Sequence, residues 1–384
     1  MSSSQRPLLI GLAASVLLVI GAVLDLESAL RSYLVAYLYV LGFGLGPLAL
    51  ILLHNASGGA WGVAIRRICE AAMRTLPVLA VGFLPIALGM GYLYPWADAE
   101  LVATDHLLQH KRPFLNPTFF CVAAAAWFAV WILLARFVDA KPKDASGADP
   151  YPTRTHRKFA GACLALYILT MTFAAFHWGM SLEPHWFSTI YGLAFVIGQA
   201  LSGMILALWI LARQVKTEPM RSHVTAGQFN DLGNLLLALV MLWAYLALSQ
   251  YLIIWSANLA EEASWYVART GHGWQVLAQL LIGLHFAVPF AVLLSRRSKR
   301  MPNRLALVAG GLIVLRAFDL FWNLAPAFHP HGFHLAWTDP VAVIGAGALW
   351  YHLFRRNLAL REPDYRPVAA AAEGAEAEAE GLSS

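Results

Sequence analysis

Residues 117–137 read PTFFCVAAAAWFAVWILLARF, an apolar run whose single charge, Arg136, stands next to its end. An α-helix needs about 20 such residues to cross the hydrocarbon core of a bilayer. Comparable runs occupy 7–24, 33–53, 71–94, 158–179, 187–211, 229–257, 274–295, 304–324 and 339–357. The sequence therefore predicts an all-α polytopic membrane protein with about ten transmembrane helices.

The composition supports this class of protein. Of the 384 residues, 59% are hydrophobic and 13% are charged, whereas about 25% of the residues in a soluble domain are charged. The first apolar run continues into a second without a small-residue cleavage site, so we interpret it as a retained helix rather than a signal peptide. The net charge of +5 follows from membrane topology, and nucleic acid is not an expected partner.

The basic residues are concentrated on one predicted side of the membrane. Twenty-two of the 27 Lys and Arg residues lie in the N-terminus, the C-terminal end and the segments 54–74, 136–158, 213–221 and 296–304. The loops on the other side hold only Arg31, Lys111, Arg112 and Arg269. By the positive-inside rule, both termini of this multi-pass protein are expected in the cytoplasm.

Two segments outside the spans have a distinct composition. The Ala/Glu/Gly-rich residues 362–384 have nothing large to bury and predict a disordered cytoplasmic tail. The outer loop 95–116 is long and amphipathic, which is typical of a segment that lies on the membrane surface or against a partner.

The sequence contains no motif for a redox cofactor or a metal ion. Cys69, Cys121 and Cys163 are far apart and form no CxxC or CxxCH spacing, which argues against covalent haem c, an iron–sulfur cluster and a structural zinc site. The outer segment FHPHGFH (328–334) is rich in histidine but lacks a carboxylate or cysteine at fixed spacing, so we favour a docking surface over a metal site. No cofactor is therefore expected on this chain.

Polar residues within the spans fall on shared helical faces. On the seventh span these are Asp231, Asn234, Tyr245, Ser249 and Ser256; on the sixth, Ser188, Tyr191, Gln199 and Ser202; on the fifth, Cys163, Tyr167, Thr170, His177 and Ser181; and on the ninth, Arg316, Asp319 and Asn323. Charges within spans usually face a bundle interior or a water-filled cavity. These faces are therefore expected to point inward.

Several of these residues have two interpretations. Arg316 and Asp319 have the spacing of a same-helix ion pair, which either ties helices together or heads a polar track that relays protons. His285 on the eighth span is either a hydrogen-bonded core histidine or a haem ligand, and the first is favoured because His177 lies at a different depth. Asp231 and Glu70 are either charges at the membrane interface or, for Asp231 with Asn234 and Ser202, the inner mouth of a proton path.

Residues 228–269, QFNDLGNLLLALVMLWAYLALSQYLIIWSANLAEEASWYVAR, resemble the signature of the F subunit of bacterial alternative complex III. The segments WFSTIYGLAFVIGQ (186–199) and RAFDLFWNLAPAF (316–328) also resemble family segments. That complex is a quinol:cytochrome c, or high-potential carrier, oxidoreductase. The resemblance covers about 30–360 and leaves out the N-terminus and the acidic tail.

The resemblance implies an NrfD-like (polysulfide-reductase-anchor-like) fold in a bacterial inner membrane. Its parts here would be a first helix and outer turn (1–32), a first four-helix bundle (33–180), a second four-helix bundle (181–325), a last outer loop with the tenth helix (326–361), and the tail. It also implies partners: a sister NrfD-like subunit, an iron–sulfur subunit, a multihaem cytochrome c subunit and small membrane subunits, surrounded by lipids. Haem c and iron–sulfur clusters would belong to those partner subunits.

The resemblance further implies that this subunit conducts protons and has a nominal site for a quinol, either menaquinol or ubiquinol. These roles would fall on residues with polar side chains in the spans. The expected proton path comprises Asp231, Asn234, Ser202, Gln199, Tyr245, Ser249, His285, Arg316 and Asp319. The expected quinone contacts are Tyr191, His177, Arg316 and Asp319.

Two functions of other classes compete with this reading. A stand-alone ion or solute transporter would usually show Gly/Pro-broken helices paired across inverted repeats, and Pro77 and Pro85 have no counterpart in the seventh span. A haem-containing reductase or sensor of nitric oxide would need two histidines at matching depth. Copurification with haem c would support the respiratory subunit, a stable haem-free monomer would contradict it, and a Soret band on the isolated chain would support the haem protein.

Overall fold

The computed structural model describes residues 5–139, 153–215 and 224–360. Within these residues all regular structure is helical, and nine helical segments are long and apolar enough to cross a membrane. The all-α polytopic membrane fold predicted from the sequence is confirmed. The tail predicted at 362–384 lies outside the described residues.

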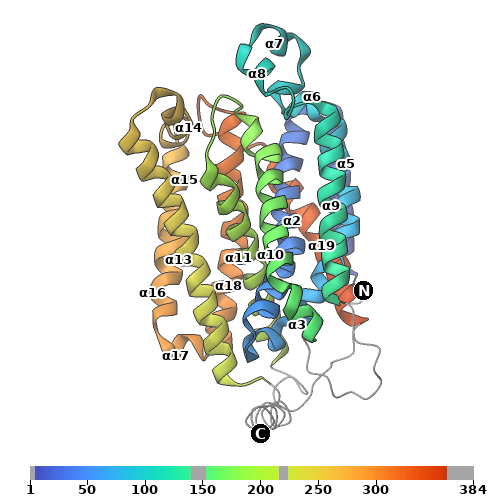
Figure 1. Ribbon diagram of the computed structural model, residues 1–384, viewed down its shortest axis with the longest axis vertical. Coiled ribbons are helices and arrows are strands. Elements are labelled where there is room, and N and C mark those ends of the chain that lie inside the picture. The colour runs from blue at the N-terminus through green and yellow to red at the C-terminus, as the bar shows by residue number, and fades with distance from the viewer. Residues whose placement is uncertain (1–4, 140–152, 216–223, 361–384) are drawn as a thin grey trace.

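Most of the predicted spans coincide with single long helices (Figure 1). These are α1 (Arg6–Leu24), α2 (Leu26–Ser57), α9 (Pro117–Asp139), α10 (Arg154–Trp178), α11 (Thr189–Gln214), α13 (Ala226–Ala257) and α18 (Pro302–Leu324). The tenth predicted span coincides with α19 (Thr338–Ala359), whose ends carry Asp339, Arg355 and Arg356. This helix is not among the nine that meet the criteria of length and apolarity in the described part of the chain.

Two spans are interrupted, and every break except the one at Gly89 lies close to a proline. The third begins at Ala60, earlier than predicted, and consists of α3 (Ala60–Met73), α4 (Leu76–Gly82), α5 (Leu84–Leu88) and α6 (Met90–Leu93), with Pro77 and Pro85 just inside α4 and α5. The eighth consists of α15 (Trp274–Leu280), the π-helix η3 (Leu281–Ala287) and α16 (Val288–Leu294). Proline removes a helical N–H donor and its ring clashes with the preceding turn, which explains the breaks close to prolines.

Short helices connect the spans. They are η1 (Pro95–Ala97), α7 (Ala99–Thr104), α8 (His106–Lys111), η2 (Met180–Leu182), α14 (Ala260–Thr270), α17 (Arg296–Lys299) and η4 (Ala325–Ala327). Figure 1 shows α7, α8 and α14 at one end of the molecule and α3 and α17 at the other. The predicted amphipathic loop 95–116 thus forms a small helical cap, in which Trp96 and Leu108 are buried.

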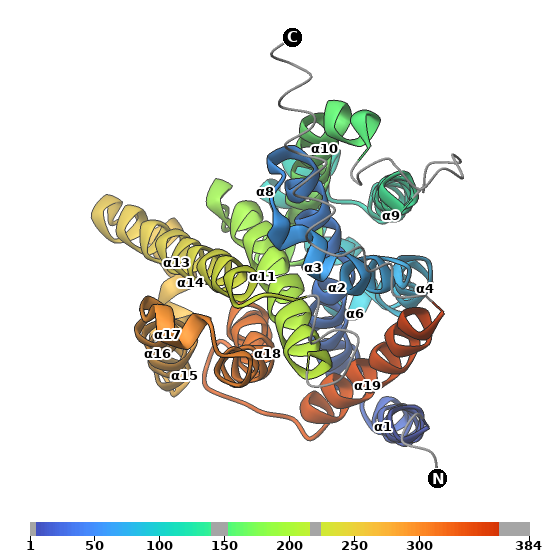
Figure 2. The ribbon, with the colours of Figure 1, turned by 90° about the horizontal axis from the view of Figure 1, so that it is seen from below.

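Helices α2 and α11 form the centre of the molecule, and the other spans pack around them (Figure 2). Helix α2 is buried on every side from Leu34 to Leu52, as expected for a helix that is apolar all round. It packs on α4, α9 and α10, whereas α11 packs on α13 and α18; α1 and α19 pack on each other at the side of α2. These contacts produce two helix groups that meet at α2 and α11.

The meeting of α2 and α11 depends on glycine. A Cβ atom added to Gly46 would lie 1.9 Å from the carbonyl oxygen of Gln199, and one added to Gly203 would lie 2.5 Å from the carbonyl carbon of Gly46. The two backbones are therefore in direct contact, the packing that small residues allow between membrane helices.

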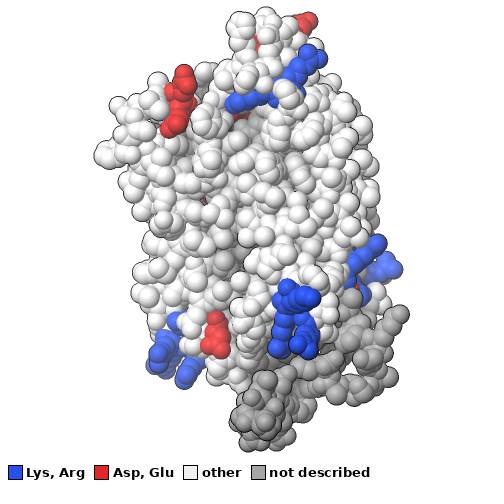
Figure 3. Space-filling model, viewed as in Figure 1, with Lys and Arg blue, Asp and Glu red and all other residues white. Residues whose placement is uncertain are grey.

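Charged side chains lie mainly at the two ends of the molecule, separated by a broad belt of uncharged surface (Figure 3). The end that carries α3 and α17 is the richer in Lys and Arg. This distribution is the one expected of a protein embedded in a bilayer.

Candidate functional site

A buried pair of opposite charges lies on α18. This helix begins with Pro302 at its first turn, a position where the missing N–H costs no hydrogen bond. Arg316 and Asp319 face the bundle interior, with 4% and 3% of their surfaces exposed, and form an ion pair along the helix. Separating the two side chains would leave two uncompensated charges in the interior. The pair is therefore expected to stay together.

Helix α11 provides the space and a hydrogen-bond partner for the Arg316 guanidinium. A Cβ atom on Gly198 would lie 2.6 Å from Nη2 of Arg316, so a larger residue here would displace the guanidinium. Arg316 Nε donates to Ser202 Oγ at 3.4 Å, and Ser202 Oγ donates to the carbonyl of Gly198 at 2.9 Å.

Gln199 connects this site to the first helix group. The hydroxyl of Tyr167 on α10 donates to Gln199 Oε1 at 2.9 Å, and Gln199 Nε2 contacts the sulfur of Met171 at 3.1 Å. All three side chains are buried. Helix α11 therefore places polar side chains against both helix groups, Gln199 against the first and Ser202 beside Arg316.

Asp319 has two further partners. The side-chain amide of Asn323 donates to the Asp319 carbonyl at 2.8 Å and lies 3.4 Å from Oδ1 of its carboxylate. The indole N–H of Trp243 on α13 donates to the same carboxylate. Three donors thus converge on one buried acid.

His285 lies at the same site, in the π-helix. Pro289 cannot donate to the His285 carbonyl four residues earlier, and the backbone widens so that Val288 donates instead to Gly283. The imidazole is fully buried, its ring centroid is 4.2 Å from that of Trp243, and it lies within electrostatic range of Arg316. Neither ring nitrogen has a hydrogen-bond partner among the described residues, and the same holds for His177 in the other helix group. What distinguishes His285 is its place beside Trp243 and Arg316.

The site extends to the end of the molecule that carries α14. Arg269, which is fully buried, donates to the carboxylate of Glu183 at 2.6 Å and to the carbonyl of Asn323 at 2.8 Å. Its guanidinium stacks on the ring of Trp265 at 3.7 Å. The Glu183 side chain is one quarter exposed, so a continuous chain of polar contacts leads from the surface to Arg316.

We refer to these residues as the polar network. It comprises Glu183, Gln199, Ser202, Trp243, Arg269, His285, Arg316, Asp319 and Asn323. Its chemistry is that of groups able to hold or pass a proton: two carboxylates, an imidazole, hydroxyl and amide groups, and two fixed cations.

The structure does not bring together the three residues of the predicted inner mouth, Asp231, Asn234 and Ser202. Asp231 and Asn234 are exposed on α13, and Asn234 Oδ1 accepts a hydrogen bond of 2.6 Å from Lys299. Ser202 instead lies near the middle of α11, beside Arg316. Among the described residues, the hydrogen bonds of Ser202 and Asn234 do not join them.

The predicted polar face of α13 also has a different orientation. Tyr245 is 65% exposed, Ser249 is half-buried and Ser256 is exposed, whereas the buried face of this helix is built mostly of apolar residues. Helix α13 lies at the edge of the molecule (Figure 2) and buries only one side. The spacing of its polar residues was correct, but it defines the outward face.

The expected quinone contacts are divided between the two helix groups. Tyr191 is buried on α11, within electrostatic range of Asp319, Glu183 and Arg269, and therefore borders the polar network. His177 is buried among the rings of Phe114, Phe119, Phe120 and Trp127 in the other group. The structure thus gives His177 no place beside Arg316.

Three residues of the network, Glu183, Trp243 and Arg269, were not predicted from the sequence. Arg269 could have been noticed, because only four basic residues lie in the predicted outer loops. Glu183 and Trp243 carry no such signal, since their roles depend on the packing of α13, α14 and α18.

The described residues contain no group of three or more His, Cys, Asp or Glu side chains that could hold a metal ion. In the outer segment 328–334, the rings of His329 and His334 lie 4.6 Å apart. Neither the comparison with protein-family models nor that with curated proteins produced a match.

Proposed function

We propose that this chain is a membrane subunit of a quinol-oxidising respiratory complex of the alternative complex III type, and that its polar network conducts protons. The chain would carry no redox cofactor itself. Haem c and iron–sulfur clusters would belong to a multihaem cytochrome c subunit and an iron–sulfur subunit, and a sister NrfD-like subunit and small membrane subunits would complete the assembly.

The position of the resembling segments supports this proposal. Residues 186–199, 228–269 and 316–328 are far apart in the sequence, yet they contain six of the nine residues of the polar network. The quoted segments therefore supply most of one site in space.

The observation that carries the proton role is the buried pair Arg316–Asp319 with its connection to Glu183. Buried charges rarely serve stability alone, because well-packed apolar residues are often as stabilising. Asp319 could accept a proton beside a fixed guanidinium, and the unpartnered ring nitrogens of His285 could accept or donate a hydrogen bond to water or to a quinol hydroxyl. A quinol headgroup at Tyr191, Arg316 and Asp319 would place its oxygen next to these groups.

The charge distribution supports a proposed orientation of the chain in the membrane. The basic end with α3 and α17 would face the cytoplasm of a bacterial cell, by the positive-inside rule, with both termini on that side. Glu183 would then face the outside, and the network would be the outer half of a path.

Purification of the complex from its native membrane tests the assembly. We expect the chain to copurify with haem c, detected by a c-type absorption band, in a mild detergent. A stable haem-free monomer with no associated subunits would contradict the proposal. The variant Arg269→Gln should retain the band but lower proton release, because it interrupts the network on the outer side of Asp319.

A stand-alone ion or solute transporter is the second candidate. The observation that favours it is the presence of one interrupted span in each helix group, at Pro77/Pro85 and at Pro289, since transporters place their sites at broken helices. A haem-free chain that alone moved ions into liposomes would support it.

A further inference from the structure

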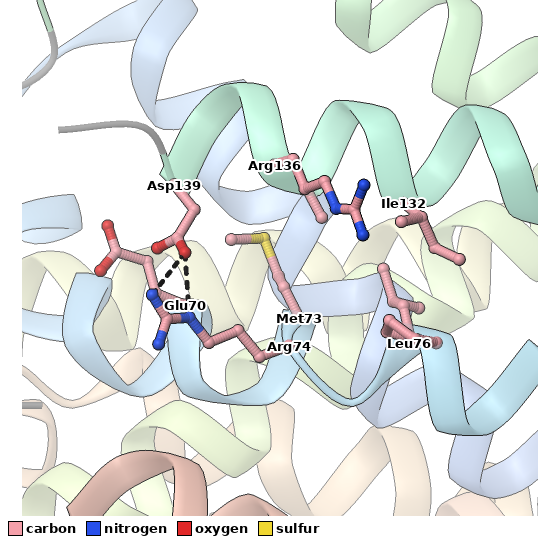
Figure 4. Close-up of a pocket in the computed structure, with 9 residues that line it drawn as sticks. Glu70, Met73, Arg74, Leu76, Ile132, Arg136 and Asp139 are labelled. Carbon is pink, nitrogen blue, oxygen red and sulfur yellow. Dashed lines mark hydrogen bonds and ion pairs between the residues drawn. The ribbon is translucent and has the colours of Figure 1, made fainter. Parts of the chain in front are cut away.

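A cavity of about 230 Å³ lies between α9 and the junction of α3 with α4 (Figure 4). None of the residues that line it belongs to the polar network. Its lining combines charged and apolar side chains. They are Glu70, Met73, Arg74, Leu76, Pro77, Ile132, Ala135, Arg136 and Asp139.

The cavity follows from the interruption of the third span. Helix α3 ends at Met73 and α4 begins at Leu76, with Pro77 in its first turn. The offset at this junction leaves room next to α9, where Ala135 contributes only a methyl group.

The charges at the cavity are unequally compensated. Glu70 accepts from Arg66 at 2.9 Å, and the Asp139 carboxylate accepts from Arg74 at 2.8 and 2.9 Å. Both carboxylates therefore have a cation. Arg136 has no ion-pair partner among the described residues, and its guanidinium points toward the space between α9 and α4 (Figure 4). The cavity thus has one uncompensated positive charge.

The surroundings of the cavity are those of a membrane surface. Leu76, Pro77 and Ile132 form an apolar wall, and the surface beyond it continues with Val78, Val81 and Leu133, which are 55%, 64% and 61% exposed. The site lies on the side of the molecule that is rich in Lys and Arg, where charge and apolar surface meet.

We propose that this cavity binds the phosphate headgroup of an anionic glycerophospholipid, with the acyl chains on the apolar surface of α4 and α9. Arg136 supplies the positive charge for the phosphate, and Arg74 lies at the same rim. Basic pockets between transmembrane helices at the cytoplasmic side are the sites that anionic lipids prefer. The cavity is too small for a whole lipid, and a free inorganic anion would make no use of the apolar wall. This inference is independent of the proposed respiratory role.

Native mass spectrometry of the full-length chain in mild detergent tests the proposal, with phosphatidylglycerol and phosphatidylcholine as probes. We expect phosphatidylglycerol to bind in preference, and Arg136→Gln to weaken its binding about fivefold, the contribution of one arginine near an anionic membrane surface. The matched control is Arg297→Gln, which removes another exposed arginine from the same end of the molecule and should leave the preference unchanged. Ala135→Phe, which fills the cavity, should lower phosphatidylglycerol binding while Arg136 is retained.

Three outcomes would overturn the proposal. The first is equal binding of the two lipids by the unaltered chain. The second is an equal loss of phosphatidylglycerol in Arg136→Gln and Arg297→Gln, which would indicate general surface attraction. The third is displacement of the lipid by millimolar inorganic phosphate, which would indicate a simple anion site. Because Arg136 is exposed, its glutamine variant should fold, and the test does not depend on the cavity-filling variant.

Discussion

The two helix groups each bury a histidine, but in opposite surroundings. His177 is enclosed by Phe114, Phe119, Phe120 and Trp127, with ring centroids as close as 4.1 Å. His285 lies next to Trp243 and within electrostatic range of Arg316.

The same contrast holds for the neighbouring polar groups. In the first group they pair locally without charge: the Trp96 indole donates to Ser181 at 3.0 Å, and the Trp131 indole donates to Thr170 at 2.9 Å. In the second group two cations and two carboxylates are joined across the turn after η2, α14 and α18. A buried histidine alone therefore indicates little, and the charges around it distinguish a structural position from a functional one.

The largest expected effect is on the contact that holds the two groups together. Gly46→Ala would place a methyl group 1.9 Å from the Gln199 carbonyl, so α2 and α11 must separate. We expect destabilisation of about 3 kcal/mol or more, measured as loss of thermal stability in detergent. The matched control is Gly161→Ala on α10, where a Cβ atom would meet nothing within 4 Å. Equal stability of the two variants would show that the close approach is not needed.

Removing half of the buried ion pair should have an effect of similar size. Arg316→Gln or Asp319→Asn leaves one charge uncompensated in the bundle interior, which typically costs about 3–5 kcal/mol. The double variant should be less destabilised than the two single variants added together, because it buries no lone charge. Denaturation in detergent measures all three, and strict additivity would mean that the pair does not act as a unit.

Replacing either histidine should have a similar, small effect on stability, but the two replacements should differ in their effect on proton movement. His177→Phe places a ring among rings, and His285→Phe removes the buried imidazole of the network, so each should change stability by less than about 1.5 kcal/mol. Only His285→Phe should slow proton movement, by about 100-fold if the imidazole takes part in transfer. Similar rates of proton release by the two variants in liposomes would remove His285 from the path.

The smallest effect concerns the outer loop beside α19. Burial, followed by the positive charges of His334 and Arg31, lowers the pKa of His329 below its ordinary value. The unfolded loop therefore takes up a proton at a higher pH than the folded loop. Stability of this segment is complete above the ordinary histidine pKa of about 6.5 and decreases as the pH falls below it.

Hydrogen exchange measures this dependence. Amide protection in residues 328–337, corrected for the intrinsic exchange rate, should fall between pH of about 7.5 and about 5.5. His329→Gln should flatten the response, whereas His331→Gln, at an exposed position of the same loop, should not. A response that survives His329→Gln would place its origin elsewhere.

The sequence predicted the helical membrane fold because apolar length and the clustering of charge leave a direct pattern in it. It also predicted the burial of Arg316, Asp319, Gln199 and Ser202, whose neighbours on both sides are apolar. It could not show which side of α13 faces inward, because helical spacing groups residues without orienting the helix. The contact of Arg269 with Glu183 depends on the folding of α14 against the end of α18, and sequence spacing carries no information on such a contact.

The central claim is that the network around Asp319 conducts protons beside redox partners, and one measurement tests it most directly. The assembled complex would be reconstituted in liposomes, and the number of protons released per electron transferred would be compared for Asp319→Asn and Asp231→Asn. These variants make the same chemical change on a buried network residue and on an exposed one. We expect Asp319→Asn to lower the ratio while electron transfer continues, and Asp231→Asn to leave it unchanged. An unaltered ratio in an assembled, electron-transferring Asp319→Asn complex would contradict the proposal and leave the ion pair a structural role alone.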